Sequence, residues 1–305
     1  MSDSNRTILS YVEEATLGTT PSTPTFQTLR YTGESLSFDV ATTASNEMRS
    51  DRNVSDLIRN DFSAGGGFDI ELSADSFDDL LESAMFGAFA SNVLKNGTTR
   101  KSFTIERGHL DINQFFQYKG MVVDTLSLNV AAGSIITGNF GFVGMSSTRS
   151  TATAASTLDA ATTTDVMNAM SNVADIKEGG STMSGVYINK LSLSVKNNLR
   201  GQKAIGNTGS VSVNSGTFEV EGSIDVYFAN GDLYDKFLNG TATSLEFTTS
   251  TSSTSGYTWK LPNIKFSSDK INAGGLNSDV METLGFKGLY SASDACTLMI
   301  TKLTT

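Results

Sequence analysis

The stretch GFDIELSADSFDDLLESAMF, residues 67–86, changes its periodicity halfway along. In its first six residues apolar and polar side chains alternate, which is the pattern of a β-strand with one buried face. From Phe77 onwards apolar residues recur at three- and four-residue spacing, and Asp75, Asp78 and Asp79 lie at the start of this second part. Because acidic residues stabilise a helix N-terminus, the stretch predicts a strand followed directly by a short helix, with Asp75 as the N-cap.

The same strand-to-helix pattern returns in GSIDVYFANGDLYDKFLNG, residues 222–240, where Gly240 can end the helix. Leu36 lies 41 residues before Phe77, and Leu191 lies 43 residues before Tyr234. Short segments on either side of the two patterns also match, and in the same order along the chain. Leu36–Val40 matches Leu191–Val195, and Phe140–Met145 matches Leu284–Leu289. Order and spacing together predict an internal duplication, and the alternative is a chance alignment of short alternating words.

The rest of the chain is a series of short alternating segments separated by Gly, Asn, Ser and Thr. Only three prolines occur, so the strand ladders are largely uninterrupted. The pattern predicts a mainly β fold. Beyond residues 35–40 and 67–72, strands are expected at 102–106, 121–130, 135–143, 186–195, 217–228, 244–249, 257–266, 280–290 and 296–302.

The predicted duplication divides the chain into three parts. Residues 1–148 form the first copy, together with an N-terminal arm, and residues 184–305 form the second. The segment between them, 149–183, is small, polar and rich in Thr and Ala. Such a composition cannot form a core of its own, so we expect this segment to connect the two copies.

Composition excludes several classes of protein. Among 305 residues there are 32 acidic and 22 basic ones, a net charge of −10, whereas nucleic-acid binding by phosphate neutralisation needs a basic face. With one cysteine and one histidine the chain has too few soft ligands for a zinc site, and we expect no metal and no cofactor. No secretory signal and no membrane span is evident, so we expect folding in a cytoplasm.

No enzyme signature is present, and we expect no catalytic residues. The aspartates 75, 78 and 79 are explained by helix capping and dipole stabilisation. His109 has no Gly-x-Ser-x-Gly elbow to act with, and it is expected in a surface loop. The glycines at 65–67 precede a strand instead of a helix, so they predict a bend and not a phosphate-binding loop.

Each half also contains a long polar segment after its first strand. Its candidate assembly residues are Glu47, Arg49, Asp51, Arg52, Asp56, Arg59 and Asp61 in the first half, and Asn198, Arg200, Gln202 and Lys203 in the second. One interpretation is a solvated loop, and the other is an arm that reaches a neighbouring subunit, where paired charges set register. The candidate helix-packing residues are Phe77, Leu80, Leu81, Tyr234, Phe237 and Leu238.

Several sequence segments together resemble a known family. They include Tyr11–Pro21, Leu29–Leu36, Arg49–Arg52 and Phe77–Leu81 in the first half, and Leu191–Gly206, Leu233–Leu238 and Gly274–Met281 in the second. The chain is similar over about residues 8–302 to the tail tube (major tail) proteins of bacteriophages with long non-contractile tails, the siphophage type. Its matching words are assembly signatures and not catalytic motifs.

The resemblance implies a β-sandwich or barrel with a flanking short helix and a long hairpin arm. It implies a structural virion protein that self-assembles as stacked rings into a helical, hollow tail tube, through which genomic DNA passes during ejection without specific binding. It also implies a place in the virion tail and, as partners, the tape measure protein and the tail-tip and terminator proteins. No membrane partner is expected.

Rings of this family are usually sixfold, with one tube domain per subunit. Two copies in one chain favour a trimer with pseudo-sixfold symmetry, and a hexamer of single elaborated domains is the alternative. From the charge of −10 we expect net negative lumen-facing residues. A second candidate class is a β-sandwich on the virion surface that binds a receptor or glycan, although Trp259 is the only tryptophan available for sugar stacking.

Overall fold

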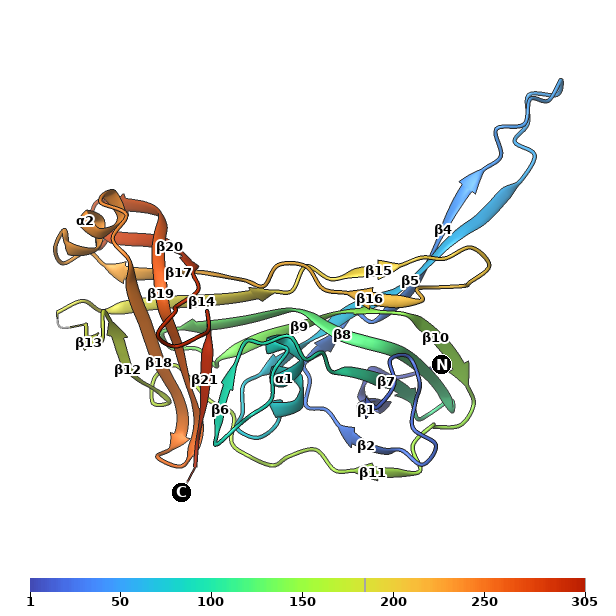
Figure 1. The fold of residues 1–305 in the computed structure, drawn as a ribbon, viewed down its shortest axis with the longest axis horizontal. Coiled ribbons are helices and arrows are strands. Elements are labelled where there is room, and N and C mark those ends of the chain that lie inside the picture. The colour runs from blue at the N-terminus through green and yellow to red at the C-terminus, as the bar shows by residue number, and fades with distance from the viewer. Residues whose placement is uncertain (184, 305) are drawn as a thin grey trace.

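The computed structural model describes residues 1–183 and 185–304, and the protein they form is mainly β (Figure 1). Two short α-helices, α1 (Asp78–Met85) and α2 (Asp232–Leu238), lie among the strands. No helix in the described residues is long and apolar enough to cross a membrane. The mainly β fold expected from the alternating segments is confirmed.

The first half of the chain builds two layers that share one long strand, β8. One layer has the strand order β4–β5–β9–β8, and the other has β1–β7–β8–β10. The strands are β1 (Thr7–Glu14), β4 (Ser37–Ala44), β5 (Leu57–Glu71), β7 (Ser102–His109), β8 (Gln114–Ala131), β9 (Thr137–Gly144) and β10 (Ser146–Ser150).

The second half repeats this arrangement around β19. One layer has the order β14–β17–β20–β19, and the other has β12–β18–β19–β21. Each of these six pairings in the second half therefore has a counterpart in the two layers of the first. The strands are β12 (Val173–Glu178), β14 (Ile188–Lys196), β17 (Glu219–Tyr227), β18 (Thr243–Ser252), β19 (Ser255–Asn272), β20 (Met281–Gly288) and β21 (Met299–Leu303).

The β-bulges recur at matching places as well. The register of β8 against β9 shifts after Val123, and that of β19 against β20 shifts after Phe266. The register of β7 against β8 shifts after Phe103, and that of β18 against β19 shifts after Thr243. A bulge bends its strand, and these bulges lie where each long strand passes from one layer to the other.

The two halves are joined by the antiparallel pairing of β8 with β14, which we call the internal junction. In it Leu126 lies opposite Val195 and Leu128 lies opposite Leu193. The pairing fuses the two four-stranded layers into one layer of order β4–β5–β9–β8–β14–β17–β20–β19. A single cluster of buried apolar side chains runs through both halves beneath this layer.

A second link joins α1 of the first half to the second half. The Asp78 carboxylate accepts a hydrogen bond from the Tyr257 hydroxyl at 2.6 Å and forms an ion pair with Lys302, also at 2.6 Å. The short strand β6 (Val93–Lys95) pairs with β21 nearby. The helix of one half is therefore docked on the outer layer of the other.

The remaining short strands lie in connections and loops. They are β2 (Thr25–Thr28), β3 (Gly33–Glu34), β11 (Thr157–Asp159), β13 (Ser181–Thr182), β15 (Arg200–Gln202) and β16 (Ser212–Asn214), with a 3-10 turn at Ser4–Arg6. Within the segment 149–183, β11 adds to β2 in parallel and β12 adds to β18. This segment thus contributes strands to both halves, including the counterpart of β1.

Close packing requires a glycine at one equivalent position in each half, Gly66 in β5 and Gly222 in β17. A Cβ on Gly66, which has a φ of 101°, would lie 2.2 Å from the carbonyl oxygen of Ser35. A Cβ on Gly222 would lie 2.1 Å from the carbonyl oxygen of Ser192. Both contacts are far shorter than any real Cβ contact, so no other residue fits at either place.

The expected strands are found, and the two expected helices are present, but the start of α1 differs from the expectation. The helix begins at Asp78 with Phe77 in the N-cap position and no side-chain cap. Asp75 lies outside the helix with a φ of 61°, and its carboxylate pairs with Lys302 at 2.5 Å. Asp75 therefore serves the contact between the halves, which a local capping pattern does not reveal.

The buried position of Phe77 gives the first prediction. This side chain is 1% exposed, and its ring centroid lies 6.0 Å from that of Phe140. We expect Phe77→Ala to lower the free energy of unfolding of the isolated subunit by about 3–5 kcal/mol, measured by urea denaturation. The control is Leu238→Ala, at an exposed helix position, which should change it by less than about 0.5 kcal/mol. Equal effects of the two variants would contradict the packing described.

Candidate assembly interface

The fused eight-stranded layer ends in two strand edges without a partner strand among the described residues. At one end β4 pairs only with β5, over residues 37–44. At the other end residues 265–272 of β19 pair only with β20. An open edge presents a row of free backbone N–H and C=O groups, which is a template for pairing with another chain.

The layer has one apolar face over the core and one polar face. Along the polar face, Asn139 donates a hydrogen bond to Asp69 at 2.7 Å, and Ser192 and Ser223 are hydrogen-bonded at 2.8 Å. In the described residues the charged side chains that alternation and register place on this face are Asp39, Asp69, Glu71, Glu219, Glu221 and Asp225, and Lys190, Lys196, Lys265, Lys270 and Lys287.

Several lysines of the polar face are neutralised by a neighbouring strand. Lys196 forms an ion pair with Glu221, and Lys287 lies 3.8 Å from Glu219. Lys190 lies directly opposite Asp225 in the register of β14 and β17. The face therefore carries many hydroxyl and amide groups and has little uncompensated positive charge.

The first predicted arm, residues 47–61, comprises most of the projecting tip of the β4–β5 hairpin, residues 45–56, and the first residues of β5 (Figure 1). Arg49 and Asp51 pair with each other at 2.7 Å, and this guanidinium lowers the pKa of the Asp51 carboxyl to about 2. Met48 at the tip is 98% exposed. Among the described residues nothing covers Met48, so the tip is accessible to a contact outside the subunit.

The second predicted arm, residues 198–206, belongs to the longer connection 197–218, which folds back onto the first half. Leu199 and Val213 are buried there in a small apolar cluster with Phe86 and Val122. The side-chain amide of Asn197 donates to the carbonyl oxygens of residues 84 and 123, both at 2.9 Å. The β15–β16 hairpin accordingly lies along the body beside β5 in Figure 1.

Besides the pair Arg49–Asp51 at the tip, the structure brings together one residue from each predicted arm. Lys203 of the second arm pairs with Asp61 at the base of the first at 2.8 Å, and this lysine lowers the pKa of Asp61. Asn198 donates to the carbonyl oxygen of residue 217 at 2.8 Å, within its own arm. The remaining candidates are exposed along the arms: Glu47, Arg52, Asp56, Arg59, Arg200 and Gln202.

Helix packing follows the expectation in α1 and departs from it in α2. Phe77, Leu80 and Leu81 are at most 1% exposed. In α2 the buried residue is Leu233, whereas Tyr234 is 39% and Leu238 is 60% exposed, with Phe237 packed at the rim of the core. The physical reason is position, because α2 lies at the end of the molecule next to the open edge of β19, with no second half beyond it (Figure 1).

The aspartates around α1 hold the helix in place. Asp79 accepts a hydrogen bond from Tyr11 at 3.0 Å, as Asp78 does from Tyr257. Burial and these carboxylates raise the pKa of both tyrosines, so both hydroxyls stay protonated and act as donors. In the residues the structure describes, no group of three or more His, Cys, Asp or Glu side chains could hold a metal ion.

Sequence reasoning missed a buried pair of acids, Asp269 and Glu282, at the open end of the second half. Glu282 is 1% exposed, and its Oε1 and both carboxylate oxygens of Asp269 are buried without a hydrogen-bond partner. Burial and the neighbouring Asp269 raise the pKa of Glu282 to about 7. The sequence does contain a sign of this pair, because Glu282 alternates with Leu284 and Phe286 and so lies on the apolar face of its strand.

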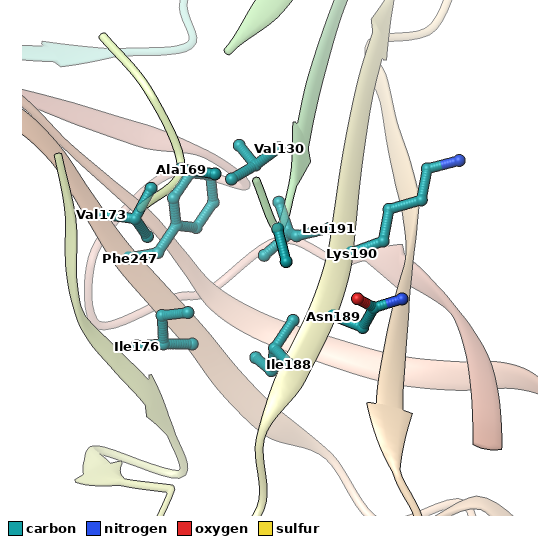
Figure 2. A pocket seen from close by; sticks show the side chains of 10 residues that line it. Val130, Ala169, Val173, Ile176, Ile188, Asn189, Lys190, Leu191 and Phe247 are labelled. Carbon is teal, nitrogen blue, oxygen red and sulfur yellow. The ribbon is translucent and has the colours of Figure 1, made fainter. Parts of the chain in front are cut away.

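A cavity also lies at the internal junction, lined by both halves (Figure 2). In this view Val130 of β8 and Phe247 of β18 lie next to each other at the upper side of the cavity, and Ile188 and Leu191 of β14 lie below them. Its wall is mostly apolar. The internal junction is therefore sealed by apolar side chains from both halves.

Comparison with protein-family models matches residues 4–288 to the family described as phage tail tube protein. The chain belongs to the phage tail tube protein family. The resemblance of the sequence words is thereby confirmed over nearly the whole chain, and with it a structural role in the virion tail. A search of curated proteins gave no match to this tail tube protein.

The raised pKa of Glu282 predicts a pH dependence of stability in the tail tube subunit. Between its usual 4.5 and about 7 the native chain keeps a proton that the unfolded chain releases. The free energy of unfolding should therefore fall by about 2 kcal/mol as the pH rises through this window. Glu282→Gln should remove this fall, measured by urea denaturation at several pH values. Identical pH profiles of the two proteins would contradict the burial of a protonated acid.

Proposed function

We propose that this protein polymerises as stacked rings into the hollow tail tube through which genomic DNA passes during ejection. Membership of the tail tube family supports the structural role. The observation that carries ring closure is the pair of open edges at opposite ends of one continuous layer. If β4 of one chain pairs with β19 of the next, the layers join into a closed barrel without edges.

We further propose that the chain contains two copies of one tail tube fold. The repeated strand order and the matching bulges support this, because independent sheets have no reason to share both. The first copy spans residues 1–148. Since β12 is the counterpart of β1, the second copy begins near residue 173, within the segment 149–183, and continues through 184–305.

On this proposal one chain fills two positions of a sixfold ring. The internal junction then stands for the contact that separate subunits make elsewhere in the family. A trimer with pseudo-sixfold symmetry is favoured, because three chains supply as many copies as six single-domain subunits. A hexamer of this chain is the alternative, and it would double the number of strands in the barrel wall.

We assign the polar face of the layer to the lumen. Its six carboxylates and five lysines leave a small net negative charge in the described residues, and three lysines already face an acid on the next strand. A surface with a small net negative charge and few uncompensated lysines holds phosphates weakly, so duplex DNA can slide along it. DNA is thus a cargo in transit and not a bound ligand.

The first arm is proposed to contact the neighbouring ring. Its exposed tip, apolar Met48 and alternating charges support a contact outside the subunit. Further proposed partners are the tape measure protein and the tail-tip and terminator proteins, with assembly in the host cytoplasm and no catalytic role. The alternative, a glycan-binding module, has no tryptophan available for sugar stacking, because Trp259 is fully buried.

The internal junction predicts the register in which two chains pair. There Ser127 lies opposite Ser194. When the two halves are aligned on their matching bulges and on Gly66 with Gly222, Lys270 takes the position of Ser127, and Ser37 takes the position of Ser194. A chain with Ser37→Cys and Lys270→Cys should therefore oxidise to covalent multimers in assembled tubes. Non-reducing electrophoresis measures this; each single variant is the control, and an absence of multimers in the double variant argues against edge pairing.

The arm gives a separate prediction. Replacing residues 46–54 by Asn-Gly leaves the β4 and β5 ladder intact, since the removed residues lie beyond the last pair, Ala44 with Leu57. Folded subunits should then form single rings that do not stack. Negative-stain electron microscopy would show this directly. Tubes of normal length from the shortened chain would reject the role of the arm in stacking.

A further inference from the structure

The inference concerns the seam between two chains and rests on the proposed pairing of β4 with β19. The internal junction shows how the same contact looks when it is made within one chain. Its apolar face is formed by Leu126 opposite Val195, with Phe247 and Val130 around a shared cavity (Figure 2). Gly138 lies opposite Leu128 beside them. This internal junction contains no charge on its apolar face.

At the open end of the second half, two of these positions hold acids. The register of β19 against β20 shifts between Phe266 and Ser268, and Asp269 is the next residue. Leu126 follows the corresponding shift between Val123 and Thr125 in the same way. Asp269 faces Leu284, as Leu126 faces Phe140. Glu282 faces Ile271, as Gly138 faces Leu128, so Glu282 takes the place of Gly138. The two acids therefore occupy apolar positions of the seam.

At the open end of the first half, the place of Phe247 is taken by Arg107. Phe247 lies opposite Trp259 in its strand pair and stacks on that ring with centroids 6.2 Å apart. Arg107 lies opposite Phe116, and its guanidinium stands 5.1 Å from that ring's centroid. The cation thus occupies the site of an aromatic ring, in the same relation to the residue beneath it.

Arg107 also has hydrogen-bonding capacity to spare. Its Nη1 donates to Glu34 at 2.8 Å and to the carbonyl oxygen of Leu36 at 3.2 Å, but its Nε is buried without a partner. A guanidinium has five donors in a planar fork, which suits a second carboxylate. The side chain lies in a groove of about 440 Å³ beside the open edge of β4, lined by Leu36–Phe38, Phe116, Tyr118 and Ser147–Arg149.

We infer that, where two chains join edge to edge, Arg107 of one chain pairs with Asp269 and Glu282 of the next. Each side carries what the other lacks: buried carboxylate oxygens without a partner on one edge, and a guanidinium with a free buried N–H on the other. Exposed Tyr234 and Leu238 of α2 lie at the acidic end and cover the groove from outside, as α1 covers the second half at the internal junction.

The charge pair makes the seam between chains chemically different from the seam within a chain. A buried acid without a cation is unfavourable, so a β19 edge that meets a strand other than β4 leaves Asp269 and Glu282 without the guanidinium of Arg107. β19 therefore pairs productively only with β4 of another chain. The ion pair sets the order of halves around the ring more than it adds affinity.

The test compares three variants with the wild-type full chain. Arg107→Phe, and separately Asp269→Leu with Glu282→Gly, should each raise the protein concentration needed for tube formation at least tenfold, measured by sedimentation. The combination of all three substitutions, made in a chain that also carries Glu34→Leu, recreates the residues of the internal junction and should restore assembly, because Arg107 is the partner of Glu34 and Leu191 takes the place of Glu34 in the second half. Lys95→Met is the control, because Lys95 is exposed in β6, which pairs with β21 inside the chain, and this variant should assemble as the wild type does.

Circular dichroism and thermal unfolding first show which variants are folded, and Arg107→Gln replaces Arg107→Phe if the latter is not. Wild-type assembly by folded Arg107→Gln, or a folded combined variant that stays unassembled, would overturn the ion pair. If that happens while the Ser37–Lys270 cysteine cross-link still forms, edge pairing stands and only the ion pair is lost. Failure of the cross-link itself would remove the proposed ring closure on which the inference rests.

Discussion

The pairing of β8 with β14 is the interaction on which the rest of the structure depends. It joins two four-stranded layers at a register that keeps all apolar side chains on one face. A shift by one residue would turn Leu191, Leu193 and Val195 toward the polar face, so the register is strongly specified. Because this pairing leaves β4 and β19 open at opposite ends, one contact determines both the core and the surfaces available for assembly.

The two arms show how equivalent segments acquire different uses. In the second half, Leu199 and Val213 give the segment after β14 an apolar surface, and it folds onto the first half. In the first half, the segment after β4 has charges and the exposed Met48 instead, and it projects. One arm therefore packs on the subunit, while the other is the one we propose for a contact between subunits. The difference follows from a few side chains within the same topology.

Local patterns were sufficient to predict most strands and both helices, because alternation and helical spacing are read within a few residues. The partners of each strand were not predictable in this way, since the pairing of β8 with β14 depends on edges distant in sequence. Asp75 illustrates the limit: its local pattern indicates a cap, but Lys302 in the last strand decides its role. The importance of Glu282 appears only when its burial is known.

The central claim is that one chain supplies two of the positions in a sixfold ring. The most direct measurement is the mass of an isolated ring, obtained by native mass spectrometry after tubes have been dissociated. Three chains per ring is the result the account predicts. Six chains per ring would contradict it, because the internal junction would then not stand in for a contact between subunits.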